Sequence, residues 1–202
     1  MRVEAFSDAV FAVAITVLVF DLKTPEHRPG KLLEALVDQW PVYVSFLASF
    51  LYVGVLWMNH HATFARIARM DRGLRLINLL LLMHTVILPF PTAMMSATIQ
   101  ESNVVDGRSA IVIYALGGAV MCATWLAFFH HLTRHRELVE PHVHERFFHS
   151  ERTRAWVGVV LYALGAGLGI AIAPEVALVV FVALPVFYGV TSEGLMEVRP
   201  AD

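Results

Sequence analysis

Long apolar runs separated by short polar breaks constrain the fold of this chain more than any other feature. The runs are about 20 residues long, the length of helix that crosses about 30 Å of hydrocarbon. Hydrophobic residues occupy 57% of the 202 positions and charged residues only 16%, whereas soluble domains carry about 25% charged residues. The sequence therefore excludes an ordinary soluble domain and predicts an all-α, polytopic membrane protein.

We expect six transmembrane helices in one membrane domain that covers residues 1–202, at about 3–22, 41–62, 74–98, 109–132, 153–173 and 175–195. Pro25 and Pro29 predict a loop after the first span. Residues 31–38 alternate charge with Leu and Val, which is typical of a short interfacial helix. Pro89 and Pro91 are expected to end or bend the third helix, because proline lacks the N–H that a helix interior needs.

The basic residues indicate how the bundle is oriented. The second and fourth connections contain or border most of the arginines, namely Arg66, Arg69, Arg72, Arg75, Arg134, Arg136, Arg146, Arg152 and Arg154. Arg2 and Arg199 bring this side to 11 of the 15 basic residues (nine plus two). By the positive-inside rule we expect a multi-pass protein of the cell membrane with both termini in the cytoplasm.

Arginine at every third position from Arg66 to Arg75 is also typical of a voltage-sensor helix. Asn59, His60 and His61 interrupt the apolar background that such a helix needs. A basic cytoplasmic connection is the simpler interpretation.

The first predicted helix has an unusual composition for a membrane span. It is apolar up to Phe20, yet Arg2, Glu4, Ser7 and Asp8 lie within its first two turns. A carboxylate at membrane depth costs about 3 kcal/mol on insertion scales, so it needs a partner or a wet cavity. We therefore expect this helix to do more than anchor the chain.

One stripe of this helix is apolar apart from a single hydroxyl. At 100° per residue the stripe contains Phe6, Ala9, Val13, Thr16, Val17 and Phe20. Glu4, Asp8 and Ile15 project from the opposite side. Two interpretations follow: the stripe packs against a neighbouring helix, or it lines a symmetric conduit while other helices hold Ser7 and Asp8. Periodicity alone favours packing.

Three motifs are similar to those of the transmembrane protein 175 family, potassium-permeable channels of lysosomes and prokaryotic membranes. The first is Arg2-x-x-x-Phe6-Ser7-Asp8 with the apolar run up to Thr16. The second is Trp57-Met58-Asn59-His60-His61-x-x-Phe64. The third is Asn78-Leu79-Leu80-Leu81 followed by Leu88-Pro89-Phe90-Pro91-Thr92. The motifs cover the first half of the chain.

This resemblance implies a prokaryotic-type potassium channel that has six helices per chain and is a homotetramer. It also implies that the first helix of each subunit lines a central pore, without the Gly-Tyr-Gly filter of ordinary potassium channels. The family's hydrophobic constriction maps by position to Val13, Val17 and Phe20, with Thr16 as a hydroxyl layer between them. Family members commonly have Ile or Leu there, so Val13 and Val17 suggest a wider neck or a barrier at Phe20.

The motif residues Arg2, Ser7, Asp8, Trp57 and either His60 or His61 are expected to form one hydrogen-bonded cluster near the cytoplasmic end. The favoured role is structural, because it neutralises Asp8 and fixes the first helix. A pH-sensing histidine beside a carboxylate is the alternative.

We expect copies of the chain, the lipid bilayer and permeant K⁺ as partners, with no cofactor, metal site, catalytic residue or nucleic acid.

Two other function classes stay open at this point. Ten histidines, among them His130, His131 and His135, suggest a membrane-embedded metalloenzyme, but no His-x-x-His-His box is present. Two apolar runs contain glycines that suggest the broken helices of a secondary transporter. They are Gly117 and Gly118 in one run, and Gly165, Gly167 and Gly169 in the other. Small residues also let helices pack closely, and we prefer this packing role for the glycines of both runs.

Overall fold

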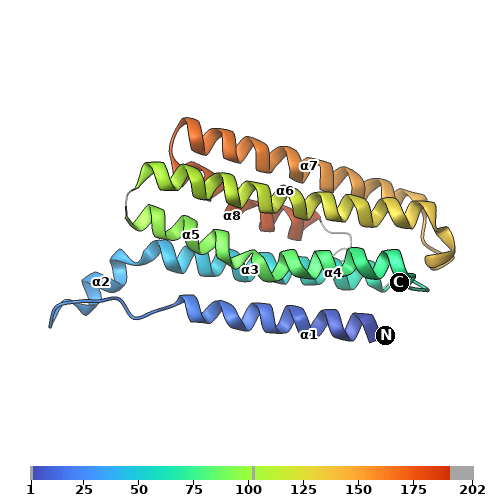
Figure 1. Ribbon diagram of the computed structural model, residues 1–202, viewed down its shortest axis with the longest axis horizontal. Helices are drawn as coiled ribbons and strands as arrows, with labels where there is room; N and C mark the ends of the chain where they lie inside the picture. The colour runs from blue at the N-terminus through green and yellow to red at the C-terminus, as the bar shows by residue number, and fades with distance from the viewer. Residues whose placement is uncertain (1, 102, 192–202) are drawn as a thin grey trace, which may run out of the picture.

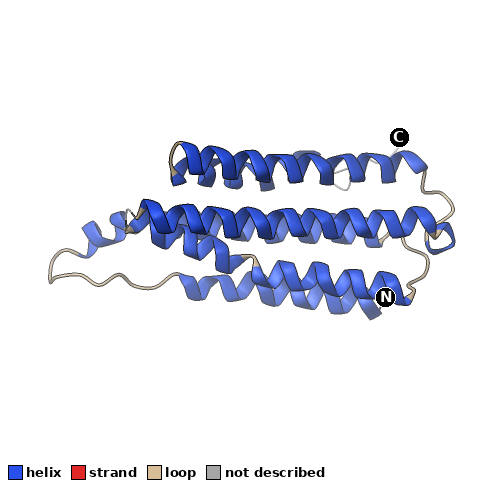
Figure 2. Ribbon diagram, turned by 45° about the horizontal axis from the view of Figure 1, so that its top comes forward, coloured by secondary structure: helices blue, strands red, loops and turns tan. Residues whose placement is uncertain are grey.

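The computed structural model describes residues 2–101 and 103–191, in which long helices run side by side along one axis (Figures 1 and 2). The helical segments are α1 (Arg2–Val17), η1 (Leu18–Asp21), α2 (Leu32–Asp38), α3 (Trp40–Phe64), α4 (Arg72–Ile87), α5 (Pro89–Gln100), α6 (Val104–Arg134), η2 (Arg136–Leu138), α7 (Glu145–Ala171) and α8 (Pro174–Thr191). Within these residues the sole β-type pairing is an isolated bridge between Ile67 and Val139. The all-α fold class is thus confirmed.

Among the described residues, five helical stretches are long and apolar enough to cross a membrane: Arg2–Asp21, Trp40–Phe64, Arg72–Gln100, Val104–Arg134 and Glu145–Ala171. The apolar helix Val176–Thr191 is shorter and overlaps the sixth expected span, whose residues 192–195 lie outside the described part. The count of six spans therefore stays a prediction.

Several expected boundaries were wrong because the helices extend beyond the apolar runs. α6 begins at Val104 rather than near 109, since the side chain of Asn103 caps it by accepting a hydrogen bond from the backbone N–H of Asp106 at 3.1 Å. α7 begins at Glu145 rather than near 153. Its polar first turns are retained in the helix because Phe147 and Phe148 are buried there.

Proline explains the break in the third apolar run. α4 ends at Ile87 and α5 begins at Pro89, so the expected interruption is present (Figure 2). The pyrrolidine ring has no N–H and collides with the carbonyl four residues earlier. The first span is not α-helical throughout, because after Val17 the chain continues as the 3₁₀ segment η1, which contains Phe20.

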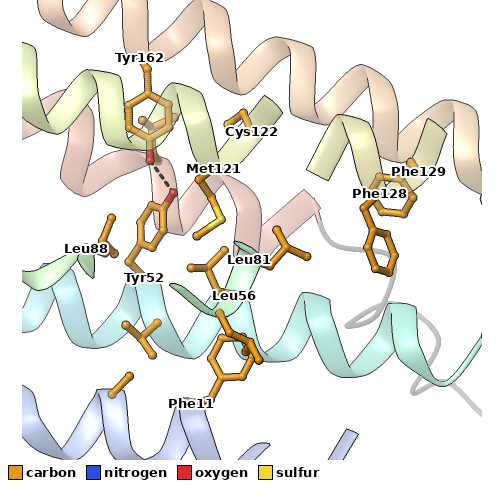
Figure 3. Close-up of a cluster of buried hydrophobic side chains, with 14 of the residues drawn as sticks. Phe11, Tyr52, Leu56, Leu81, Leu88, Met121, Cys122, Phe128, Phe129 and Tyr162 are labelled. Atoms are coloured by element: carbon orange, nitrogen blue, oxygen red, sulfur yellow. Dashed lines mark hydrogen bonds between the residues drawn. The ribbon is translucent and has the colours of Figure 1, made fainter. Parts of the chain in front are cut away.

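The interior of the bundle contains aromatic side chains that meet across helices (Figure 3). Tyr162 of α7 donates a hydrogen bond of 2.7 Å to the hydroxyl of Tyr52 of α3. Gly118 of α6 makes room for this pair, because a Cβ at that position would overlap the Tyr162 ring. These contacts connect α3, α6 and α7 in the interior of the bundle.

The connections 65–71 and 135–144 meet at the end of the bundle where α1 begins, which we call the basic end. The N–H of Ala68 donates to the carbonyl of Leu138 at 2.8 Å, and that of Glu140 donates to the carbonyl of Arg66 at 3.0 Å. The Arg66 guanidinium lies 4.7 Å from the centre of the Phe147 ring. The two connections therefore form one docked unit with the start of α7.

Candidate functional site

The apolar stripe of α1 is not packed within its own protomer. Val13 is 61% exposed, Val17 51% and Phe20 73%, and Thr16 lies on the same open side. Phe6 and Ala9 of the predicted stripe are exposed too. The whole stripe therefore faces away from the described part of the protomer (residues 2–101 and 103–191), which excludes packing of the stripe against a described helix of the same chain.

The opposite face of α1 is anchored to the bundle. Its buried residues are Ser7, Phe11 and Ala14, followed by Leu18 in η1. Phe11 reaches toward Leu56 of α3 (Figure 3) and meets the His60 ring edge-on, with 5.2 Å between ring centres. Burial of this face fixes which side of α1 is turned outward.

A side-chain hydrogen bond connects α1 to α3 at the edge of this buried face. The indole Nε1–H of Trp57 donates to the Asp8 carboxylate at 3.0 Å. Both side chains also line a groove between the two helices, together with Phe11, Ile15 and Val53. Asp8 thus has the partner that a carboxylate in an apolar segment requires.

A second, fully buried chain of hydrogen bonds connects α1 to α3 through α4. The ring Nε2 of His60 lies 2.8 Å from the Asn78 Oδ1, and the Asn78 amide donates to the Ser7 hydroxyl at 3.0 Å. That hydroxyl in turn donates to the carbonyl of Val3 at 2.9 Å. Because the Asn78 oxygen needs a donor, this arrangement places the His60 proton on Nε2. The Nδ1 atom is left buried and without a partner among the described residues.

The predicted single cluster of motif residues was therefore wrong: the structure contains two networks. Successive side chains on a helix point about 100° apart, so Asp8 faces Trp57 while Ser7 faces Asn78. His60 bonds Asn78 rather than Asp8.

The other two members of the expected cluster, His61 and Arg2, are not hydrogen-bonded into either network within the described residues, although the His61 ring lies 5.9 Å from the Trp57 ring. His61 Nδ1 approaches Glu4 at 3.8 Å on the surface. Arg2 is exposed, with no side-chain partner in the described part of the chain. Asn78 was missing from the expected site, although an amide inside an apolar run is a signal that could have identified it.

Thr16 is the one polar residue of the exposed stripe beyond the first two turns. Its hydroxyl donates to the carbonyl of Val13 on its own helix at 2.9 Å. The hydrogen is therefore directed at the backbone, and the oxygen lone pairs are left for an outside donor or a cation. Four such oxygens around an axis would form a weak ligand ring for a partly dehydrated ion.

Sequence comparisons connect this arrangement to known proteins. The family described as the endosomal/lysosomal potassium channel TMEM175 matches residues 2–89. A potassium channel of Streptomyces collinus is 40% identical over 189 residues, which is 93% of this chain and 90% of that protein. A potassium channel of Chamaesiphon minutus is 46% identical over 117 residues, 56% of each chain. The chicken endosomal/lysosomal proton channel TMEM175 is 31% identical over 179 residues, 82% of this chain and 35% of that protein.

Solved structures agree with these relatives. The crystal structure of a lysosomal potassium-selective channel TMEM175 homolog from Chamaesiphon minutus superposes with a TM-score of 0.79 and 30% identity, and it covers 95% of this chain and 97% of that one. A variant of the potassium channel MtTMEM175, bound to a nanobody–MBP fusion, superposes with a TM-score of 0.65 at 18% identity and supports the fold alone.

Proposed function

Because this chain belongs to the TMEM175 family of potassium channels, we propose that it conducts K⁺ through a central pore lined by α1 from each of four copies. The family resemblance of the three sequence motifs is confirmed. The relatives are channels rather than enzymes, so the metalloenzyme interpretation is wrong. No cofactor is expected, because the ion itself is the permeant species.

The exposed stripe of α1 is the observation that carries this proposal. An apolar helix face of a membrane protein has three possible neighbours: lipid, another subunit or a pore. Lipid alone would not require two polar networks to fix the rotation of α1. The networks through Asp8 and Asn78 hold that rotation, so that Val13, Thr16 and Val17 point the same way in every copy.

The proposed neck acts through hydrophobicity and width. Rings of Val13, Val17 and Phe20 around an axis exclude water when they are narrow, and hydrated ions are then blocked. Phe20 is the largest and the most exposed of them, so we assign it the principal barrier. A small rotation or widening of α1 would let partly hydrated K⁺ pass, with Thr16 oxygens replacing some of its water ligands.

The proposal includes six spans in the cell membrane with both termini in the cytoplasm. Its support is the basic end, where the connections 65–71 and 135–144 meet, since arginine-rich connections are retained on the cytoplasmic side. The multi-pass membrane character itself follows from the spanning helices and the family. Transport coupled to a second solute is the competing proposal, and it predicts saturation and a need for two gradients.

Cadmium block of introduced cysteines tests the pore assignment. Cys122 is buried, so Cys122→Ser provides a background without the native thiol. In that background Val13→Cys or Thr16→Cys should make K⁺ flux from liposomes of purified protein sensitive to micromolar Cd²⁺, because several thiolates then converge on the axis. Val112→Cys, on an exposed site of α6, is the matched control. Robust K⁺ flux with no block at either α1 position would overturn the proposal.

A further inference from the structure

A second hollow lies at the basic end, away from α1. It is an open groove of about 540 Å³ between the end of α6, the segment η2 and the first two turns of α7. Its polar and basic lining residues are Thr133, Arg136, Arg146, His149, Ser150 and Arg152. Glu145 is the one carboxylate among the lining residues, so the groove has a clear excess of positive charge.

Arg136 is held rigidly in this groove. Its guanidinium lies 4.8 Å from the centre of the Phe148 ring, and one of its nitrogens donates to the carbonyl of Val143 at 3.0 Å. Arg146 and Arg152 are exposed and make no ion pair or side-chain hydrogen bond within the described residues. Their charges are therefore available, while Arg136 gives the site a fixed edge.

We propose that this groove binds the phosphate of an anionic phospholipid. Planar guanidinium groups bind phosphate oxygens through paired N–H donors, and three arginines line this groove. The Thr133 hydroxyl already donates to the carbonyl of His130 at 2.8 Å, so its oxygen is an acceptor suited to a glycerol hydroxyl. The site is separate from the pore proposal and does not depend on it.

The course of α7 favours a lipid over a free phosphate ion. Four residues further along from Arg152 is Trp156, followed at the same spacing by Val160 and Leu164, which form a ridge. Trp156 is 59% exposed, Val160 53% and Leu164 56%. Along α7 the basic groove is therefore followed by an indole and then by an apolar ridge. This order matches the headgroup, the interfacial region and the acyl chains of a lipid.

Native mass spectrometry of the purified protein tests this assignment. The probes are phosphatidylglycerol and phosphatidylcholine with identical acyl chains. We expect preferential retention of phosphatidylglycerol, reduced about 25-fold in Arg146→Gln/Arg152→Gln, since each basic side chain near an anionic surface contributes about fivefold. Arg69→Gln/Arg72→Gln removes the same charge from the same end outside the groove and should retain the preference.

Each other outcome contradicts the proposal. Equal loss in both double variants would show attraction to general surface charge, and no loss in either would place the lipid elsewhere. Inorganic phosphate at millimolar concentration that displaces phosphatidylglycerol completely would show a phosphate site without lipid specificity. The four arginines are exposed, so these variants should fold, and gel-filtration profiles check that they do.

Discussion

Trp57 donates its indole N–H to the carboxylate of Asp8 at 3.0 Å, across the interface between α3 and α1. The two residues are 49 positions apart in the chain. Through this contact the rotation of the exposed helix is set by the helix behind it. Asp8 therefore has a positioning role, and its charge does not need to reach the proposed pore.

Trp57→Phe should destabilise the protein by about 2 kcal/mol, because hydrogen bonds to charged groups contribute about 1.5–3 kcal/mol. Thermal unfolding of the purified protein in detergent measures this loss. Trp40→Phe, at another half-exposed indole of the same helix, is the control and should change the unfolding temperature little. An equal effect of the two substitutions would contradict the role of the Asp8 contact.

Asp8→Ala should reduce the yield of assembled protein more than the current through each assembled channel. Without its carboxylate, α1 loses one of its two rotational anchors, and the stripes of different copies no longer face one axis. Gel filtration gives the yield of the oligomer, and single-channel recording gives the conductance. A normal oligomer yield with normal conductance would show that Asp8 is dispensable.

Asn78→Leu should cost more than the loss of one hydrogen bond. It leaves the buried His60 ring nitrogen without its partner, and the buried Ser7 hydroxyl keeps only its bond to the carbonyl of Val3. A buried polar group without a partner costs about 1–3 kcal/mol. Ser96→Ala is the control on the neighbouring α5, because within the described residues the Ser96 hydroxyl bonds only the carbonyl of Ala93 in its own helix. An equal loss of unfolding free energy for the two variants in chemical denaturation would refute the bridging role of Asn78.

The sequence was sufficient to predict the apolar helices and which residues of α1 share one stripe, since both follow from local periodicity. Periodicity alone favoured packing of that stripe against a neighbouring helix, however, and only the family resemblance implied that the stripe is open. The sequence was not sufficient for the polar contacts. Ser7 and Asp8 are adjacent in the chain, but which neighbour each one meets depends on where α3 and α4 lie around α1. Asn78 became recognisable as the bridge only when that arrangement was known.

The positions at which helices begin and end were also predicted poorly from the sequence. The first turns of α7 are polar in sequence, and hydropathy therefore places the start of the helix too late. The structure begins it at Glu145 because Phe147 and Phe148 are buried under the guanidinium groups of Arg66 and Arg136. These contacts come from distant connections, which no local pattern reveals.

Two glycines of α7 should respond oppositely to alanine. A Cβ at Gly158 would overlap the hydroxyl of Tyr188 on α8, whereas no atom of the described residues lies within 4 Å of a Cβ at Gly167. Gly158→Ala should lower the free energy of unfolding by about 1–3 kcal/mol through overpacking. Gly167→Ala should be neutral or stabilising by up to about 1 kcal/mol. Similar unfolding temperatures for both variants would contradict close packing of α7 on α8.

Asp71 makes the start of α4 sensitive to acid. Its carboxylate accepts the N–H of Leu74 at 2.7 Å and lies 2.8 Å from the His131 ring, and these contacts, the Leu74 hydrogen bond first, lower the pKa of Asp71. A lowered pKa adds stability above the ordinary value of about 4, and this stability is lost as the pH falls below it.

Asp71→Ala should therefore cost about 1 kcal/mol at pH 7, as the loss of a helix cap does. Asp71→Asn should cost less, because an amide oxygen still accepts the Leu74 N–H. Thermal unfolding followed from pH 7 to pH 3 should show the difference between wild type and Asp71→Ala shrinking at the acid end. A difference that stays constant over this range would show that the carboxylate charge is irrelevant.

Thr16→Ala should weaken discrimination between K⁺ and Na⁺ by about fivefold, if each permeating ion loses about 1 kcal/mol of ligand contact. The Thr16 hydrogen is directed at the carbonyl of Val13, so the oxygen is the group left to face an ion in the proposed pore, where selectivity would depend on that acceptor. Thr16→Ser keeps the oxygen and should retain the wild-type reversal potential under mixed K⁺ and Na⁺. If Thr16→Ala leaves the reversal potential unchanged, or Thr16→Ser shifts it as much, then the hydroxyl ring does not select the ion and selectivity arises from the width of the neck.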